Sequence, residues 1–150
     1  MSKLADNKRA LYDYQILEKF ETGLVLTGPE VKSAKGGRMN LQGAYVIPKG
    51  SELWLTGANI ALYLPAKIQQ AGYDSLRDRK LLLKQAELAY LLGKIREKGL
   101  TLVPVSVYTS RRLIKLEIGL ARGKTKYDKR AEIRKREVNR EIRSSLKFKG

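Results

Sequence analysis

The sequence predicts a fold of the α+β class, mainly β, with short helices and a basic tail at the C-terminal end. Several short segments alternate apolar and polar side chains and are separated by Gly, Pro or Asn, which is typical of antiparallel strands joined by turns. The last thirty residues hold twelve Lys or Arg and four Asp or Glu, which is half of the net charge of +16. They contain no apolar block large enough for a core, so we expect them to form a tail.

The first part of the chain is predicted to contain two short strands. Residues 1–10 are polar, and we expect them to be flexible. Alternation over 12–17 favours a strand, and a short buried strand is expected at 24–26. A Thr-Gly pair between these two segments is typical of a turn or a bulge.

A short helix should follow. The sequence TGPE at 27–30 indicates its start, because Pro suits the first helical position and an acidic residue suits the positive end of the helix dipole. The adjacent Gly36 and Gly37 are expected to end it.

The middle of the chain is predicted to add three short strands, at 43–47, 53–55 and 59–62. The sequence PKGS at 48–51 is typical of a hairpin turn between the first two of them. Trp54 lies in the middle of a predicted strand, and we favour a core position over an exposed one.

The next segments are a linker at 63–75 and a helical segment at 76–98, where apolar residues recur at spacings of three, four or seven. It is either one helix or two helices joined near 84–85. Gly99 should end that helix. Two alternating runs over 100–120 then predict a hairpin. Pro104 has no N–H to donate to a ladder, which indicates an edge strand or a bulge there.

About six short antiparallel strands in roughly a hundred residues must close on themselves or form a sandwich to protect their edges. We therefore predict a small closed β-barrel of the oligonucleotide-binding type over 11–121, with short flanking helices. Residues 122–150 form the basic tail, which we expect to be disordered in the free protein and helical when bound.

The composition excludes several kinds of chemistry. The chain has no His and no Cys, so His/Cys zinc sites, Ser-His-Asp triads and Cys-His triads are excluded. We expect neither an enzyme nor a cofactor. Neither a secretory signal nor an apolar run long enough for a membrane span is present, which favours a cytoplasmic protein without a membrane partner.

The basic tail indicates a polyanionic partner, and RNA is the leading candidate. A protein that neutralises phosphates releases counterions, which favours binding. A membrane surface fits less well, because the apolar stripe of the tail is thin and four acidic residues interrupt it.

Five motifs in order are similar to those of a known family. They are GPEVKS at 28–33, GRMNL at 37–41, RDRKLLL at 77–83, KGLTLVP at 98–104 and GKTKYDKR at 123–130. With these motifs, the chain resembles the SmpB family, the SsrA-binding proteins of bacterial trans-translation, over nearly its whole length.

The resemblance implies a closed barrel of the oligonucleotide-binding type and a tail that is disordered in the free protein. It implies binding to the tRNA-like domain of transfer-messenger RNA and delivery of that RNA to stalled bacterial ribosomes. The barrel would hold the RNA elbow, and the tail would fold into the vacant mRNA channel near the decoding centre, against small-subunit rRNA. We expect a monomer when the protein is free.

The first predicted RNA site follows the Gly-rich turn. Cations there can meet phosphates, and a hydroxyl or an amide can bond to bases or 2′-hydroxyls. A carboxylate would accept from a base edge or orient a neighbouring Lys or Arg. The alternative is that the glycines only end a helix and Asn40 caps a turn. The resemblance assigns RNA contact to Glu30, Lys32, Ser33, Arg38 and Asn40.

The second predicted site is the start of the tail, where an aromatic residue within a basic run suits stacking on a base. A solvated charge run is the alternative. RNA contact is expected from Lys124 and Lys126, and the resemblance places Tyr127, Asp128, Lys129 and Arg130 near the decoding site.

Secondary candidates are Arg77, Arg79 and Lys80, which are either RNA contacts or the solvated side of a first helical turn. The chain also departs from the family, which commonly has His in the segment 58–85 where this chain has none.

Two other functions remain open from the sequence. One is a ribosomal or ribosome-assembly protein that binds rRNA through its basic tail. The other is a carboxylate-metal nuclease, for which the only candidate acids are Asp13, Glu18, Glu30 and Asp128, and nothing brings them together.

Overall fold

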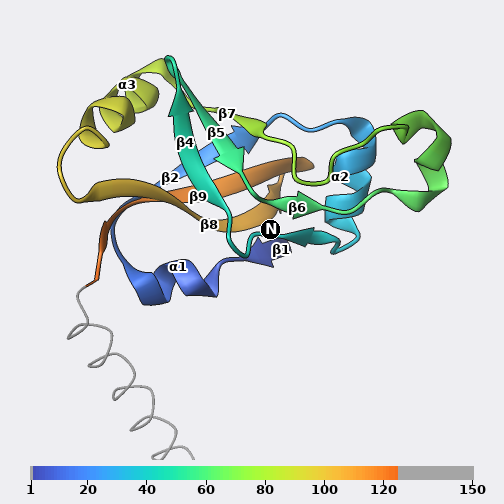
Figure 1. Cartoon of the computed structure of the whole chain (residues 1–150), viewed down its shortest axis with the longest axis horizontal. Helices are drawn as coiled ribbons and strands as arrows, with labels where there is room; N and C mark the ends of the chain where they lie inside the picture. The colour runs from blue at the N-terminus through green and yellow to red at the C-terminus, as the bar shows by residue number, and fades with distance from the viewer. Residues whose placement is uncertain (1, 125–150) are drawn as a thin grey trace, which may run out of the picture.

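The computed structural model describes residues 2–124 (Figure 1). The elements follow one another as β1 (Ser2–Asp6), α1 (Lys8–Asp13), β2 (Tyr14–Leu24), α2 (Gly28–Lys35), β3 (Met39–Asn40), β4 (Tyr45–Lys49), β5 (Glu52–Thr56), β6 (Asn59–Ile60), the 3-10 helix η1 (Leu64–Gln70), β7 (Arg79–Leu82), α3 (Gln85–Lys94), β8 (Leu100–Ser110) and β9 (Leu113–Gly123). The predicted α+β class, mainly β, is confirmed.

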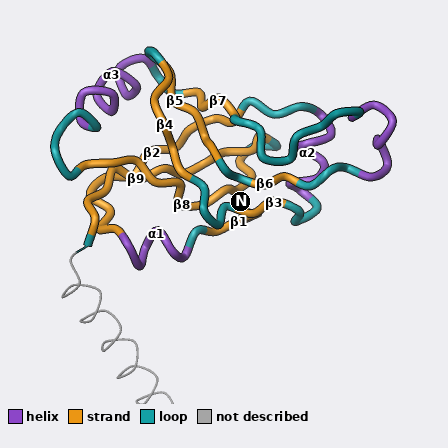
Figure 2. Tube along the Cα trace, in the orientation of Figure 1, coloured by secondary structure: helices purple, strands orange, loops and turns teal. Residues whose placement is uncertain are grey.

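Seven strands form one antiparallel sheet in the order β1-β8-β9-β2-β7-β5-β4, and β3 pairs separately with β6. Strand β4, at one end of this order, also packs against β8. The sheet therefore curls so that its β4 end lies beside β8, although no strand pairing within residues 2–124 joins β4 to β8 to close the predicted barrel. The helices lie around the rim of the curled sheet (Figure 2).

The chain forms the long hairpin β8–β9, as the alternation over 100–120 predicts. Leu116 and Ile118 of β9 and Val107 of β8 are fully buried and form part of one large core cluster. The ladder shifts register between Pro104 and Ser106, so the predicted irregularity at Pro104 is a bulge. It is not an edge, because β8 pairs with β9 on one side and with β1 on the other.

The prediction of a flexible N-terminus was wrong. β1 pairs with β8, and the Asn7 side chain attaches the start of α1 to the same strand. The buried Asn7 side chain donates from Nδ2 to the Pro104 carbonyl (2.9 Å) and accepts at Oδ1 from the backbone N–H of Ala10 (3.3 Å), which caps α1. The first strand expected from residue 12 therefore begins at Tyr14, after this helix.

The predicted core position of Trp54 was also wrong. Leu53 and Leu55 are both fully buried, so strand alternation turns Trp54 to the opposite face of β5. There it is half-buried, and the Lys49 Nζ lies 4.9 Å from the centroid of its ring.

Residues 76–98 do not form one helix. Arg79–Leu82 is the strand β7, which pairs Leu81 with Leu24 of β2 and Lys80 with Trp54 of β5. The sheet needs a strand between β2 and β5, and this pairing overrides the helical spacing of the leucines. Only α3 keeps the predicted helical conformation.

The sheet also extends beyond the expected boundary at 121. β9 continues to Gly123, and the backbone N–H of Lys124 donates to the Asp13 carbonyl (2.9 Å). The tail as defined by the fold therefore starts after Lys124.

Replacing Asn7 by Ala should lower the free energy of unfolding by about 1–3 kcal/mol, because a helix cap is lost and the buried Pro104 carbonyl loses its donor. Urea unfolding followed by circular dichroism measures this. The exposed neighbour Lys8 provides the control, since Lys8→Ala should change stability by less than about 0.5 kcal/mol. Equal effects of both substitutions would show that the N-terminal segment is not fastened as described.

Candidate nucleic-acid interface

Helix α2 begins where the sequence predicts, and it begins with a capping box. The Thr27 hydroxyl accepts from the backbone N–H of Glu30 (3.3 Å), and the Glu30 carboxylate accepts from the backbone N–H of Thr27 (3.0 Å). The helix ends at Lys35, and Gly37 follows with a φ of +80°, a conformation that glycine adopts without a Cβ penalty. The capping box directs the Glu30 side chain into the protein.

The Glu30 carboxylate is buried between two arginines. Its Oε2 accepts from Arg79 Nη2 (2.7 Å) and Nε (3.1 Å) and from Arg77 Nε (3.2 Å), and its Oε1 accepts from Arg77 Nη2. The Tyr73 hydroxyl donates to the same Oε2 (3.1 Å). Glu30 is 1% exposed, so the carboxylate orients Arg residues, which is one of the two roles that the sequence left open for it.

Arg79 is fully buried, and its guanidinium joins several separate segments. It donates from Nη1 to the Ala58 carbonyl (2.6 Å) and from Nη2 to the Ser75 carbonyl (3.0 Å), in addition to Glu30. The Tyr73 hydroxyl also reaches the Ile60 carbonyl (2.7 Å). Arg79 therefore has no exposed surface to offer an RNA and serves the fold, while Arg77 is partly exposed.

The charges of this network are stable at physiological pH. Burial alone raises the pKa of the Glu30 carboxyl, but hydrogen bonds from Arg77, the Thr27 backbone and Arg79 outweigh burial and lower the pKa from 4.5 to about 2. Burial and the neighbouring Glu30 charge raise the pKa of Tyr73, so its hydroxyl remains a donor.

Ser33, another predicted contact, also faces inward. It is 1% exposed, and its hydroxyl donates to the Ala61 carbonyl (2.6 Å), which joins α2 to the chain after β6. The predicted surface contacts of Ser33 and Glu30 are therefore replaced by interior bonds that fix α2 in position.

The other three residues of the first predicted site are exposed on this fixed base. Lys32 lies with its Nζ 5.6 Å from the centroid of the Tyr63 ring, and Arg38 follows the glycine turn. Asn40 pairs across the small sheet with Asn59. Its Oδ1 accepts from the backbone N–H of Gln42 (2.8 Å), so it caps a turn, and no hydrogen bond within residues 2–124 engages its amide nitrogen.

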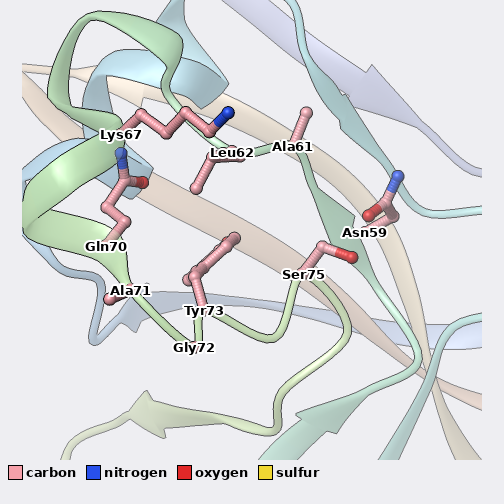
Figure 3. Close-up of a pocket in the computed structure, with 9 residues that line it drawn as sticks. All are labelled: Asn59, Ala61, Leu62, Lys67, Gln70, Ala71, Gly72, Tyr73 and Ser75. Atoms are coloured by element: carbon pink, nitrogen blue, oxygen red, sulfur yellow. The ribbon is translucent and has the colours of Figure 1, made fainter.

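An open hollow adjoins these residues (Figure 3). Lys67 and Gln70 lie on one side of it, Asn59 and Ser75 on the other, and Tyr73 between them. Sequence reasoning did not single out these lining residues as contacts. The signal that could have identified Tyr73 is its place just before the RDRK motif, inside the segment where the chain departs from the family.

The remaining candidates are not brought together with α2. Lys80 lies on β7, with its Nζ 3.4 Å from Glu52 Oε1. Lys124 lies beside α1, with its Nζ donating to the Leu11 carbonyl (2.9 Å), at the opposite end of the molecule from α2 (Figure 1). Outside the described residues lie Lys126, Tyr127, Asp128, Lys129 and Arg130.

Two further features concern the described part of the chain. Within residues 2–124, no three Asp or Glu side chains gather as metal ligands would. None of the helices formed by these residues has the length and apolar character needed to cross a membrane.

Replacing Glu30 by Gln should lower the free energy of unfolding at pH 7 by about 3–5 kcal/mol, because the buried Arg79 charge loses its counter-charge. Urea unfolding measures this. As a control, Glu52→Gln alters an exposed pair, which contributes about 0–1 kcal/mol.

The same variant should change the response to acid. Because the folded-state pKa of Glu30 lies below its ordinary value, its contribution to stability is complete above pH 4.5 and is lost as the pH falls towards about 2. The loss of stability across this window should therefore be smaller for Glu30→Gln than for the wild type. Parallel curves would contradict the assignment.

Comparison with known proteins identifies the family to which the chain belongs. Residues 4–148 match the family model described as "SmpB protein". A protein of Sulfurihydrogenibium sp., named SsrA-binding protein, is 48% identical over 97% of this chain and 95% of its own length. A protein of the same name from Anaeromyxobacter dehalogenans is 46% identical over 95% of this chain and 86% of its own length.

A solved structure described as "tmRNA-SmpB: a journey to the center of the bacterial ribosome" contains a similar chain. The TM-score is 0.65 and the sequence identity is 45%, over 81% of this chain and 84% of the other. The family model covers almost the whole chain, and both named relatives match nearly all of it. This chain belongs to the SmpB family.

Proposed function

We propose that this protein binds the tRNA-like domain of transfer-messenger RNA and delivers it to stalled ribosomes in trans-translation. The relatives named SsrA-binding protein and the similar chain in the tmRNA–SmpB structure support this proposal. The single observation in the fold that carries it is the buried Glu30–Arg79 pair, which fixes a surface of exposed cations and amides.

The RNA-binding surface consists of the exposed residues around α2. Lys32, Lys35 and Arg38 supply cations for phosphates, and Asn40 supplies an amide for a base edge or a 2′-hydroxyl. The Tyr63 ring beneath Lys32 adds an aromatic face close to a cation. Because buried bonds hold α2 and its glycine turn, little conformational entropy is lost when these groups meet RNA.

Glu30, Ser33 and Arg79 act from beneath this surface. Each is at most 1% exposed. Each also forms a hydrogen bond to a segment of the chain that contains an exposed residue or lies next to one. They therefore determine RNA affinity by positioning α2 and need no direct contact with the RNA.

The tail is the ribosome-directed part of the protein. Lys126 and Tyr127 to Arg130 combine cations with an aromatic ring, a combination that suits single-stranded or irregular RNA such as rRNA near the decoding centre. β9 ends at Gly123 beside α1, away from α2 (Figure 1), so the residues that join the tail to the sheet lie apart from the α2 end. The protein acts without catalysis, in the bacterial cytoplasm where the ribosomes are.

The wild-type protein should bind a tRNA-like domain more tightly than an ordinary tRNA of equal length, and this preference should persist as salt rises, because shape recognition adds to phosphate contact. Fluorescence anisotropy over a salt series measures both affinities. Equal binding that collapses with salt would reflect charge alone. It would favour a ribosomal or ribosome-assembly protein that binds rRNA through the tail.

A stop after Lys124 should leave binding to the tRNA-like domain within several-fold of wild type and abolish tagging on stalled ribosomes. The cut belongs there because Ala121, which is fully buried, and Gly123 are part of β9. Asn40→Ala should have the reverse effect and weaken RNA binding with the tail intact. Gln42→Ala, at an exposed position in the same turn, provides the matched control.

Circular dichroism establishes that each of these variants is folded before binding is compared. Loss of RNA affinity in the folded truncation would contradict the division of labour. Unchanged affinity of Asn40→Ala would remove Asn40 from the interface.

A further inference from the structure

The turn that joins β8 to β9 contains two arginines in a conformation that arginine disfavours. Ser110 pairs with Leu113, so Arg111 and Arg112 form a two-residue hairpin loop. Their φ angles are +50° and +68°. Two positive φ angles in such a loop are characteristic of a type I′ turn, for which Asn-Gly is the favoured sequence because a Cβ is unfavourable there.

These arginines also lack a carboxylate partner among the described residues. Both are exposed, and no ion pair within residues 2–124 involves either of them. Folding therefore places two adjacent guanidinium groups, neither in an ion pair within residues 2–124, at the tip of the β8–β9 hairpin, in a backbone conformation that another sequence would adopt with less strain. Strained positions of this kind are retained where the side chains serve a function.

Further cations surround the tip. Lys35, the last residue of α2, donates from Nζ to the Arg112 carbonyl (3.4 Å), which joins the turn to the glycine turn after α2. Arg112 lines an open hollow together with Lys3 of β1, Lys35 and Gly37. The Asp6 carboxylate lies on the β1 side of this region, with Oδ2 3.5 Å from Lys3 Nζ. Positive charge thus predominates where β1, α2 and the hairpin meet.

We propose that the β8–β9 turn is a second RNA contact, in which Arg111 and Arg112 bind backbone phosphates. Guanidinium groups bind phosphate oxygens in a bidentate manner, and phosphates would offset the mutual repulsion of these cations. The turn lies beside the glycine turn that precedes Arg38, so it extends the interface at the α2 end. This inference rests on the proposed function for its RNA partner, and none of the five motifs of the family includes the turn.

The test replaces both residues with the sequence that the turn favours, Arg111→Asn with Arg112→Gly. This change removes the charges and relieves the backbone, so the variant should unfold at a higher urea concentration than wild type. RNA affinity should nevertheless fall on the order of tenfold or more at 0.1 M salt. The slope of log affinity against log salt should become shallower by about one for each phosphate that the variant no longer binds.

Two further variants make the result specific. Arg96→Ala with Lys98→Ala removes the same charge from exposed positions after α3, away from α2, and should change affinity and slope much less (Figure 1). Arg111→Lys with Arg112→Lys keeps the charges and the strained turn, and should retain most of the salt dependence while losing bidentate contacts.

The phosphates could belong to the tRNA-like domain or to rRNA, so binding is measured with the isolated tRNA-like domain and with purified ribosomes. A loss with the first assigns the turn to the tRNA-like domain, and a loss only with the second assigns it to rRNA. Identical behaviour of the Asn-Gly variant and the wild type in both assays would overturn the proposal. A loss of ribosome binding with an unchanged salt slope would also overturn it, because it would indicate a protein contact.

The wild-type salt series separates this inference from the proposed function. If wild type shows no preference for the tRNA-like domain, the proposed function fails. A drop in affinity and slope that is specific to the Asn-Gly variant would still establish the turn as a phosphate site.

Discussion

The buried carboxylate of Glu30, held between Arg77 and Arg79, is the interaction on which the α2 end of this protein depends. Desolvating one carboxylate and a fully buried guanidinium is costly, and the cost is offset only because nearly every polar atom of the group has a partner. The benefit of such a network is geometric. It determines how α2, the residues after β5 and the segment before β7 lie relative to one another, with a directionality that apolar packing lacks.

That geometry gives the protein two distinct ends. At one end, a rigid turn displays Lys32, Arg38 and Asn40 on a base of satisfied interior bonds. At the other, β9 ends at Gly123 and the chain continues into its most basic segment. A rigid basic surface favours recognition by shape. The α2 end and the end of β9 lie apart in the described part of the molecule (Figure 1).

Local rules account for what could be predicted from the sequence. The β8–β9 hairpin, the turn before β5 and the start of α2 were predicted correctly, because alternation, turn residues and caps act within a few residues. The strand β7 and the ordered N-terminus were missed, because their pairing partners lie far away in the sequence. The same holds for the site. A motif identifies Lys32 and Asn40 as polar residues after a helix start, but the burial of Glu30 follows from Arg79, which reaches it only through the tertiary fold.

The strand order has a consequence for how the protein is made. In the sheet, β8 and β9 lie between β1 and β2, so the two strands synthesised first are not joined through the sheet until the two synthesised last have emerged. Long-range pairing of this kind delays folding, because loop closure must precede most of the stabilising contacts. During translation the chain therefore cannot complete its sheet until Gly123, the last residue of β9, has left the ribosome.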